Sequence, residues 1–232
     1  MPLYTEVVCV RGKNSQFSQL SRLIESERLK VVCIDHADQA ISIIQRRKPA
    51  LILMDLLLEG KDAMDLLKEI EQRGLSRYSS VVVLSDRSEN YVEITALNSG
   101  ADDFLVKPVN KRVFISRLHA WLRIRSASRG AVNQKNSSEE IILDQERYTL
   151  AVNGNEVLLQ RKEFEIISLL ASKPKKVFSR DEIKELVWGE PSHGVRNRTI
   201  DVHIRNLRIK IGKEYIKTFK GIGYSFDSAL TN

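Results

Sequence analysis

The first half of the chain alternates short apolar runs with segments in which apolar residues recur every three or four positions. Five of the runs predict buried strands, because they are nearly continuous in branched aliphatic residues. They are Val7–Val10, Val31–Ile34, Leu51–Met54, Val81–Leu84 and Phe104–Val106. The segments between them, such as the one containing Phe17, Leu20 and Ile24, predict helices with one apolar face. Since parallel strands need crossover helices, residues 1–125 predict an α/β domain with a five-stranded parallel sheet.

The pattern changes after residue 125. Residues 126–140 are small and polar, which predicts a linker because such a segment buries little apolar surface. Short strand-like runs then follow at 141–143, 148–152 and 157–159, with Asn153-Gly154 as a turn signal between the last two. Residues 141–232 therefore predict a second domain that begins with a small antiparallel sheet.

Three helical patterns complete the second domain, around 164–170, 181–187 and 198–211. Ser179, followed three residues later by Glu182, is a capping-box pattern at the start of the second of these helices. Apolar runs at 216–219 and 224–226 flank Gly221-Ile222-Gly223, which predicts a terminal hairpin. Three helices followed by a hairpin predict a winged helix-turn-helix domain.

Charge sharpens this interpretation. The chain carries a net charge of +7, and residues 196–220 contain eight basic residues against two acidic ones. Such a local excess indicates a polyanionic partner. We expect that partner to be double-stranded DNA.

Composition argues against several other classes. No apolar run approaches the length of a membrane span, and the start resembles no secretory signal, so we expect a cytoplasmic protein without membrane contact. Cys9 and Cys33 both fall in apolar runs, which predicts buried reduced thiols and no disulfide framework. The four histidines show no metal-ligand spacing, so we expect neither a metal-centred site nor an enzyme.

The third helix of the second domain has two kinds of face. Ile200, Ile204, Leu207 and Ile211 form an apolar stripe that should face the core. The other faces carry the candidate DNA contacts, and the chemistry of major-groove reading favours Val202, Arg205 and Asn206 as base readers. The full predicted set is Arg198, Thr199, Val202, Arg205, Asn206, Arg208 and Lys210 on the helix, with Lys220 on the hairpin.

Residues 141–226 resemble the effector domain of the OmpR/PhoB family of response regulators. The motifs that carry the resemblance are Lys162-Glu163-Phe164-Glu165, Val177-Phe178-Ser179-Arg180, Val187-Trp188-Gly189, residues 198–204 and Lys220-Gly221-Ile222-Gly223-Tyr224. The resemblance implies a recognition helix in the major groove and a wing that brings Lys220 to the minor groove. It also implies that the loop from Trp188 to Val195 contacts RNA polymerase.

Residues 6–125 are similar to the receiver domain of the same family, a flavodoxin-like fold. The resemblance places the phosphoacceptor at Asp55, which ends the third strand, and the phosphate-binding residues at Ser85 and Lys107. It also gives Phe104 the role of the aromatic side chain that swings inward.

One element of that family pattern is missing. The family has two acidic residues after the first strand that hold a divalent cation, whereas this chain has Arg11-Gly12-Lys13. Because magnesium requires several oxygen ligands, we expect Mg²⁺ binding to be poor and no cofactor to be held. Arg11 or Lys13 is instead expected to pair with Asp55. The alternative is weak cation binding through Asp55, a carbonyl and water, assisted by Asp35.

A phosphate-independent regulator still needs a dimer to occupy paired half-sites. The resemblance suggests that Asp102 or Asp103 pairs with Arg117 across a receiver dimer. Val113, Phe114 and Trp121 offer apolar area on the last receiver helix, although the same side chains can equally belong to the domain core.

The sequence thus predicts a homodimeric, sequence-specific DNA-binding transcription regulator that is largely independent of aspartyl phosphorylation. The alternative is an ordinary two-component response regulator, switched when a histidine kinase phosphorylates Asp55. A flavodoxin-like enzyme fused to a DNA module is disfavoured, because no glycine-rich phosphate loop follows the first strand.

Overall fold

A computed structural model of the chain describes residues 5–12, 17–127, 141–144, 148–152, 155–189 and 195–227. The chain divides into two compact units, residues 1–122 and 123–232, which we describe separately. The last receiver helix continues to Ala127, so the first two residues of the predicted linker are helical. The remainder of that linker, residues 128–140, lies outside the described residues, as does the predicted Asn153-Gly154 turn.

The first unit is built on the predicted five-stranded parallel sheet, with strand order β2-β1-β3-β4-β5. Its strands are β1 (Glu6–Val10), β2 (Lys30–Ile34), β3 (Leu51–Asp55), β4 (Ser80–Ser85) and β5 (Asp103–Val106). All five predicted strands are confirmed. Because β1, β3 and β4 are buried along almost their whole length, both faces of the sheet are covered, as a parallel sheet requires.

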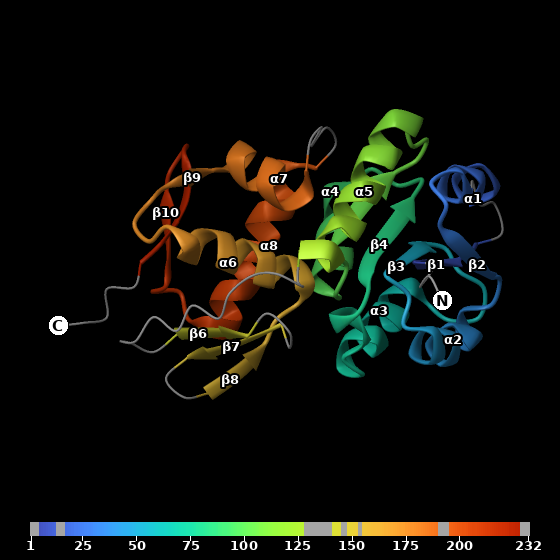
Figure 1. The fold of residues 1–232 in the computed structure, drawn as a ribbon, viewed down its shortest axis with the longest axis horizontal. Helices are drawn as coiled ribbons and strands as arrows, with labels where there is room; N and C mark the ends of the chain where they lie inside the picture. The colour runs from blue at the N-terminus through green and yellow to red at the C-terminus, as the bar shows by residue number, and fades with distance from the viewer. Residues whose placement is uncertain are drawn as a thin grey trace. The chain divides into compact units, whose positions relative to one another are not determined.

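The described α-helices that connect these strands are α1 (Phe17–Ser26), α2 (Ala40–Arg47), α3 (Ala63–Gln72) and α4 (Asn90–Asn98), and α5 (Lys111–Ala127) follows β5. Figure 1 shows them on the two sides of the sheet. Helices α1 and α5 cover one side, where Phe17, Phe114 and Trp121 pack against alternate strand residues such as Cys9. Phe114 and Trp121 are therefore core residues. Of the two interpretations that the sequence left open, a dimer surface or the domain core, the second holds for both.

Strand β2 lies at an edge of the sheet, which changes one expectation. Cys9 is buried on the central strand β1, as predicted, but Cys33 on β2 is exposed. An edge strand lacks a neighbour on one side, so an apolar run there does not guarantee burial. Val31 and Val32 on the same strand are likewise only partly buried.

The second unit contains two three-stranded sheets. The first is antiparallel, with strands β6 (Ile141–Asp144), β7 (Thr149–Val152) and β8 (Asn155–Leu158), as predicted. The second contains the predicted hairpin, β10 (Ile216–Phe219) and β11 (Gly223–Phe226), together with β9 (Phe178–Ser179), which the sequence did not predict. Gly223 is required where β9 meets β11, because a Cβ there would lie 1.9 Å from the Phe178 carbonyl oxygen.

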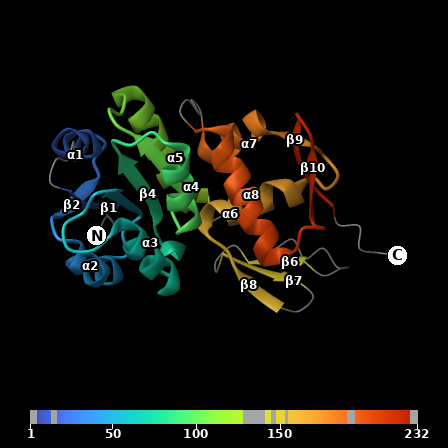
Figure 2. The same cartoon turned by 180° about the vertical axis from the view of Figure 1, so that it is seen from behind.

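Three helices pack between these sheets: α6 (Arg161–Ser172), α7 (Arg180–Trp188) and α8 (Asn197–Ile211). Figure 2 shows α8 crossing α6 with α7 beside them, the winged-helix arrangement that the sequence predicted. The capping box at Ser179 and Glu182 is confirmed: the Glu182 amide donates to Ser179 Oγ at 3.1 Å, and the Ser179 amide donates to Glu182 Oε2 at 2.8 Å. The predicted stripe of Ile200, Ile204, Leu207 and Ile211 is buried in this core.

None of the helices described has the length and apolar character needed to cross a lipid bilayer.

Candidate functional site

The carboxyl ends of the parallel strands form a cavity of about 570 Å³. Asp55 ends β3, Ser85 ends β4, Lys107 follows β5 and Gly12 follows β1, so four strands each place one residue there. Leu56, Leu57, Leu58, Glu59, Gly60, Leu84, Asp86 and Arg87 complete the lining. The topology therefore assembles the predicted pocket from residues far apart in the sequence.

Both carboxylate oxygens of Asp55 are engaged. Lys107 Nζ donates to Oδ1 at 2.9 Å, and the Gly12 amide donates to Oδ2 at 2.8 Å. Asp55 and the Lys107 side chain are both nearly inaccessible to solvent. Burial alone would lower the pKa of Lys107, but the hydrogen bond and charge of Asp55, aided by Asp86, raise it. The pocket thus holds an ion pair between Asp55 and Lys107, with Asp86 as a second carboxylate 3.2 Å from the same Nζ.

Arg11 does not have the predicted role. Its guanidinium pairs with Asp35 at 2.6 Å, at the exposed rim, and Arg11 does not line the cavity. Of the two cations predicted to pair with Asp55, Arg11 does not, because its side chain leaves the end of β1 toward β2 while the backbone turns to Asp55. Lys13 lies outside the described residues. At Asp55 Oδ2 the backbone amide of Gly12 takes the place that a side-chain cation was predicted to occupy.

Gly12 is a site residue that sequence reasoning missed. A Cβ at this position would lie 2.0 Å from the Leu57 carbonyl oxygen and 3.3 Å from Asp55 Cβ, so only glycine allows this approach. A glycine directly after a buried strand is the signal that could have identified it. The close approach leaves no room for any side chain at position 12.

Two other pocket predictions have mixed outcomes. Ser85 lines the cavity, and its Oγ accepts a hydrogen bond of 2.9 Å from the Arg87 amide. Phe104 is 5% exposed and therefore buried, but it does not line the cavity. Its ring is thus a core side chain of the domain and not a wall of the pocket.

The predicted dimer pair is an intradomain contact. Arg117 Nη1 lies 3.1 Å from Asp103 Oδ2, and both side chains are 1% exposed. Asp103 also accepts from the Trp121 indole at 3.2 Å, while Asp102 accepts from the Val81 amide at 2.7 Å. Side chains this deeply buried cannot reach a second copy, so the prediction of an intermolecular pair was wrong for Asp102, Asp103 and Arg117.

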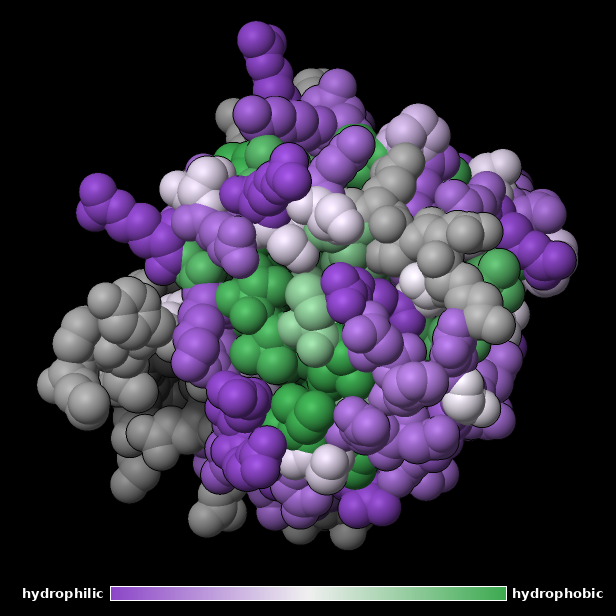
Figure 3. All heavy atoms as spheres, turned by 90° about the vertical axis from the view of Figure 1, so that its right-hand side faces the viewer, coloured by the Kyte–Doolittle hydropathy of each residue, from purple (hydrophilic) through white to green (hydrophobic). Residues whose placement is uncertain are grey.

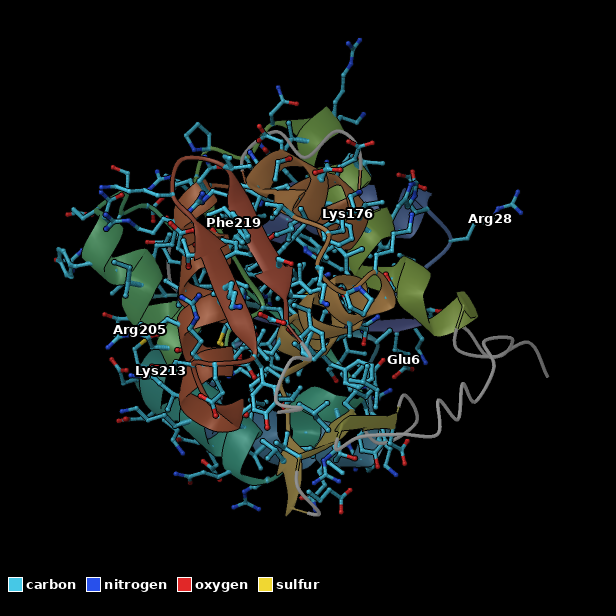
Figure 4. All side chains as sticks on the ribbon, turned by 90° about the vertical axis from the view of Figure 1, so that its left-hand side faces the viewer. Glu6, Arg28, Lys176, Arg205, Lys213 and Phe219 are labelled. Carbon is cyan, nitrogen blue, oxygen red and sulfur yellow. The ribbon has the colours of Figure 1, made fainter. Side chains whose placement is uncertain are left out.

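The candidate DNA-binding face lies on α8 and the hairpin. Arg198, Arg205 and Lys220 are exposed, and Asn206 is half-buried. Figure 4 shows Arg205 on α8 and Lys213 just after its end, beside the hairpin that carries Phe219. Arg205 and Ile209 are four positions apart and therefore share one face of the helix. Ile209 is 71% exposed, which places an apolar side chain within this basic face.

Four predicted DNA contacts differ from expectation. The buried side of α8 is wider than the predicted stripe, and Thr199, Val202 and His203 belong to it. Thr199 and Val202 are therefore buried. Arg208 Nε donates to the Ile216 carbonyl at 3.1 Å and its Nη2 donates to Thr218 Oγ1 at 2.7 Å, so it ties α8 to the hairpin. Lys210 pairs with the buried Glu163 at 2.8 Å. The structure therefore does not support these four as exposed contacts.

A partly buried polar cluster holds the candidate face in position. Arg180 Nε donates to Asp201 Oδ1 at 2.9 Å, and its Nη2 donates to the Tyr224 hydroxyl at 2.9 Å. Tyr224 in turn donates to Asp201 Oδ1 at 2.6 Å. One contact network thus joins the start of α7, the first half of α8 and strand β11.

Comparison with known proteins agrees with both halves of this description. Residues 7–119 match the family model for the response regulator receiver domain, and residues 154–226 match the model for the carboxyl-terminal domain of transcriptional regulatory proteins. The phosphate regulon transcriptional regulatory protein PhoB of Rhizobium meliloti is 32% identical over 209 residues, which cover 88% of this chain and 91% of that protein.

Other relatives extend over nearly the whole chain. The sensory transduction protein RegX3 of Mycolicibacterium smegmatis is 28% identical over 235 residues, covering 96% of this chain and 99% of that protein. Among solved structures, a RitR mutant aligns with a TM-score of 0.76 at 24% identity, covering 97% of this chain and 99% of that one, which is a likeness of fold. The chain belongs to the OmpR/PhoB family of response regulators, in which a receiver domain precedes a DNA-binding domain.

Proposed function

We propose that this chain is a homodimeric, sequence-specific DNA-binding regulator of transcription whose activity is largely independent of phosphorylation of Asp55. The observation that carries the proposal is the state of the Asp55 carboxylate. One oxygen accepts from Lys107 and the other from the Gly12 amide, at the position where the family has acidic residues.

The donor set around Asp55 does not fit magnesium. A magnesium ion in a protein takes oxygen ligands in nearly octahedral geometry, and phosphoryl transfer between anions relies on such a cation. Among the nearby carboxylates, Asp35 pairs with Arg11, and Asp86 with Lys107 at 3.2 Å, while Glu59 also lines the cavity. A divalent cation would have to displace these fixed positive charges.

The DNA-binding part of the proposal rests on the exposed basic groups of α8 and the hairpin. A major groove admits one α-helix, in which arginine can pair with guanine and asparagine with adenine. Arg205 and Asn206 fit those roles, with Ile209 as an apolar contact for a thymine methyl group. Arg198 and Lys220 are suited to phosphate or minor-groove contacts.

The family resemblance supports RNA polymerase as a further partner through the loop from Trp188 to Val195, of which residues 190–194 lie outside the described residues.

A homodimer would let two recognition helices occupy half-sites one helical turn apart. Because Arg117, Asp102 and Asp103 are buried, the dimer would have to use other receiver residues. The competing function is an ordinary regulator served by a histidine kinase, and it differs in whether Asp55 takes phosphate.

The test uses the full chain and a DNA site selected from a random pool. The protein is incubated with a small phosphodonor and Mg²⁺, assayed for acid-labile phosphate by mass spectrometry, and titrated with the selected DNA by fluorescence anisotropy. We expect no phosphate on Asp55 and the same affinity with and without donor. Asp55→Asn, which preserves side-chain size, should bind DNA as the wild type does.

Asp65→Asn, which changes an exposed carboxylate on α3, is the matched control for loss of charge. Phosphate on Asp55 together with tighter DNA binding would establish the ordinary, kinase-switched regulator instead.

A further inference from the structure

We propose that Cys9 and Cys33 form a redox-active pair, in which a hydroperoxide oxidises the Cys33 thiol and Cys9 then closes a reversible disulfide between strands β1 and β2. This modification site goes beyond the proposed function and does not depend on whether Asp55 takes phosphate.

The first argument is geometric. Cys9 and Cys33 are the two cysteines of the chain, and they are direct partners in the parallel register of β1 and β2. Neighbouring strands lie about 4.8 Å apart, and residues in register point to the same side of a sheet. Disulfides span Cα separations of about 4.4 to 6.8 Å, so the backbone already holds the two residues at a distance that a bond can bridge.

The second argument is the difference in environment between the two thiols. Cys9 belongs to the core cluster that includes Phe17 and Leu20 of α1. Cys33, one strand closer to the edge, is exposed. Figure 3 faces the side of this unit that carries the edge strand and shows hydrophobic side chains across its centre, between hydrophilic margins. A small oxidant can therefore reach Cys33 at the surface, whereas Cys9 is buried.

The third argument is electrostatic. Hydrogen bonds from Cys9 and from the Ser21 hydroxyl, whose Oγ lies 3.8 Å from Cys33 Sγ, together with the charge of Arg11, lower the pKa of Cys33 to about 6. Partial burial and the charge of Asp35 oppose this shift. The hydrogen bond to Cys33 and burial raise the pKa of Cys9, with Asp55 adding to the effect. Near neutral pH the pair thus consists of one accessible thiolate and one protonated thiol, and the thiolate is the form that reacts with peroxides.

The chemistry balances in two steps. The Cys33 thiolate attacks one oxygen of the hydroperoxide, so an S–O bond forms and the O–O bond breaks. The leaving alkoxide or hydroxide takes a proton from solvent water, and sulfur loses the two electrons that the peroxide gains. The Cys9 sulfur then attacks the Cys33 sulfur, the S–S bond forms, the S–O bond breaks, and the departing hydroxide leaves as water with the Cys9 proton. A small thiol reductant reverses the sequence by thiol–disulfide exchange.

The experiment uses the reduced full chain, treated near pH 7 with a small excess of hydrogen peroxide and quenched with an alkylating agent. A non-reducing tryptic digest analysed by mass spectrometry should contain the Cys9 and Cys33 peptides joined with loss of two hydrogens. Dithiothreitol should restore both peptides. Before oxidation, alkylation of Cys33 should be at least about ten-fold faster than that of Cys9.

Three variants separate the roles of the residues. Cys9→Ala should accumulate sulfenic acid on Cys33, which dimedone traps, because the resolving thiol is gone. Cys33→Ser, at the exposed position, should leave Cys9 unmodified in the folded protein. Ser21→Ala should move the pH profile of Cys33 alkylation to higher pH, a shift that loss of packing alone would not produce. Far-UV circular dichroism of each variant checks that the fold is retained.

Several results would overturn the proposal. They are the absence of the joined peptide after peroxide, a Cys33 alkylation profile at the ordinary cysteine pKa, and a disulfide that links two chains through Cys33 as the main product.

Discussion

The phenol of Tyr224 donates a hydrogen bond of 2.6 Å to Oδ1 of Asp201, and so fixes strand β11 of the hairpin to helix α8. Arg180 contacts both groups from the first turn of α7. All three residues fall in the motifs by which the chain resembles its family. Their role here is to hold the hairpin and the helix in one geometry, so the two candidate DNA-binding elements form a single surface.

Removing the Tyr224 hydroxyl should loosen that surface. Tyr224→Phe loses two charge-assisted hydrogen bonds, and we expect the second unit to lose about 1 to 2 kcal/mol of unfolding free energy. Hydrogen exchange followed by mass spectrometry over residues 197–211 and 216–226 measures the loss. Tyr91→Phe, which changes an exposed ring in the first unit, is the control. Unchanged protection in Tyr224→Phe would mean that the contact does not hold the hairpin.

The same contact predicts a pH dependence. Burial, together with the hydrogen bond and charge of Asp201, raises the pKa of Tyr224 to about 12 from its ordinary value of 10.0. A raised pKa means that the folded state favours the neutral phenol, so its stabilising contribution is complete below pH 10 and is lost as the pH rises toward 12. The stability difference between wild type and Tyr224→Phe should therefore shrink over that interval in urea titrations. A difference independent of pH would contradict this explanation.

Gly12 should tolerate no side chain. Because a Cβ would lie 2.0 Å from the Leu57 carbonyl oxygen, Gly12→Ala must displace the loop after β3, at a cost of at least about 1 to 3 kcal/mol. Arg11→Ala, next to it, removes only a partly exposed ion pair and should cost less than about 1 kcal/mol. Urea midpoints of the two variants make the comparison. Equal midpoints would show that the close approach is not a constraint.

Arg117 should behave as a core residue. Arg117→Met leaves the Asp103 carboxylate buried without its cation, and breaking such a pair costs about 3 to 5 kcal/mol. We expect a large fall in the stability of the first unit, measured by thermal unfolding, together with unchanged association in sedimentation experiments under folding conditions. If association weakened while the stability of the first unit stayed the same, the result would support the intermolecular pairing of Arg117 that the sequence suggested.

The sequence predicted the architecture well because the evidence for it is local. The strands of the first unit are nearly continuous apolar runs, the Ser179 capping box lies within four residues, and the stripe from Ile200 to Ile211 follows helical spacing. Each of these patterns is decided by neighbours in the chain. The same holds for the position of Asp55, because the end of a buried parallel strand is visible in the sequence.

The errors concern partners distant in the sequence. Arg11 or Lys13 was expected to pair with Asp55, but Arg11 pairs with Asp35, because side-chain direction at the end of a strand depends on the neighbouring strand. Arg208 was assigned to DNA and instead contacts Ile216 and Thr218, since helical spacing cannot show how a hairpin folds back on the helix. Cys33 was expected to be buried, but strand order, which the sequence does not reveal, places β2 at the edge.

The final prediction separates two kinds of DNA contact. Lys220→Ala removes an exposed charge from the hairpin and should weaken binding to specific and random DNA alike, with a shallower dependence of affinity on salt. Asn206→Ala should instead relax preference at one base pair, by about 1 to 3 kcal/mol of discrimination. Arg208→Ala is the control, because its contacts to Ile216 and Thr218 predict a loss of stability without a change in preference. Fluorescence anisotropy with the selected site, single-base variants and random DNA at several salt concentrations distinguishes the three. Equal losses on specific and random DNA for Asn206→Ala would remove it from base reading and leave Arg205 as the remaining polar reader on α8.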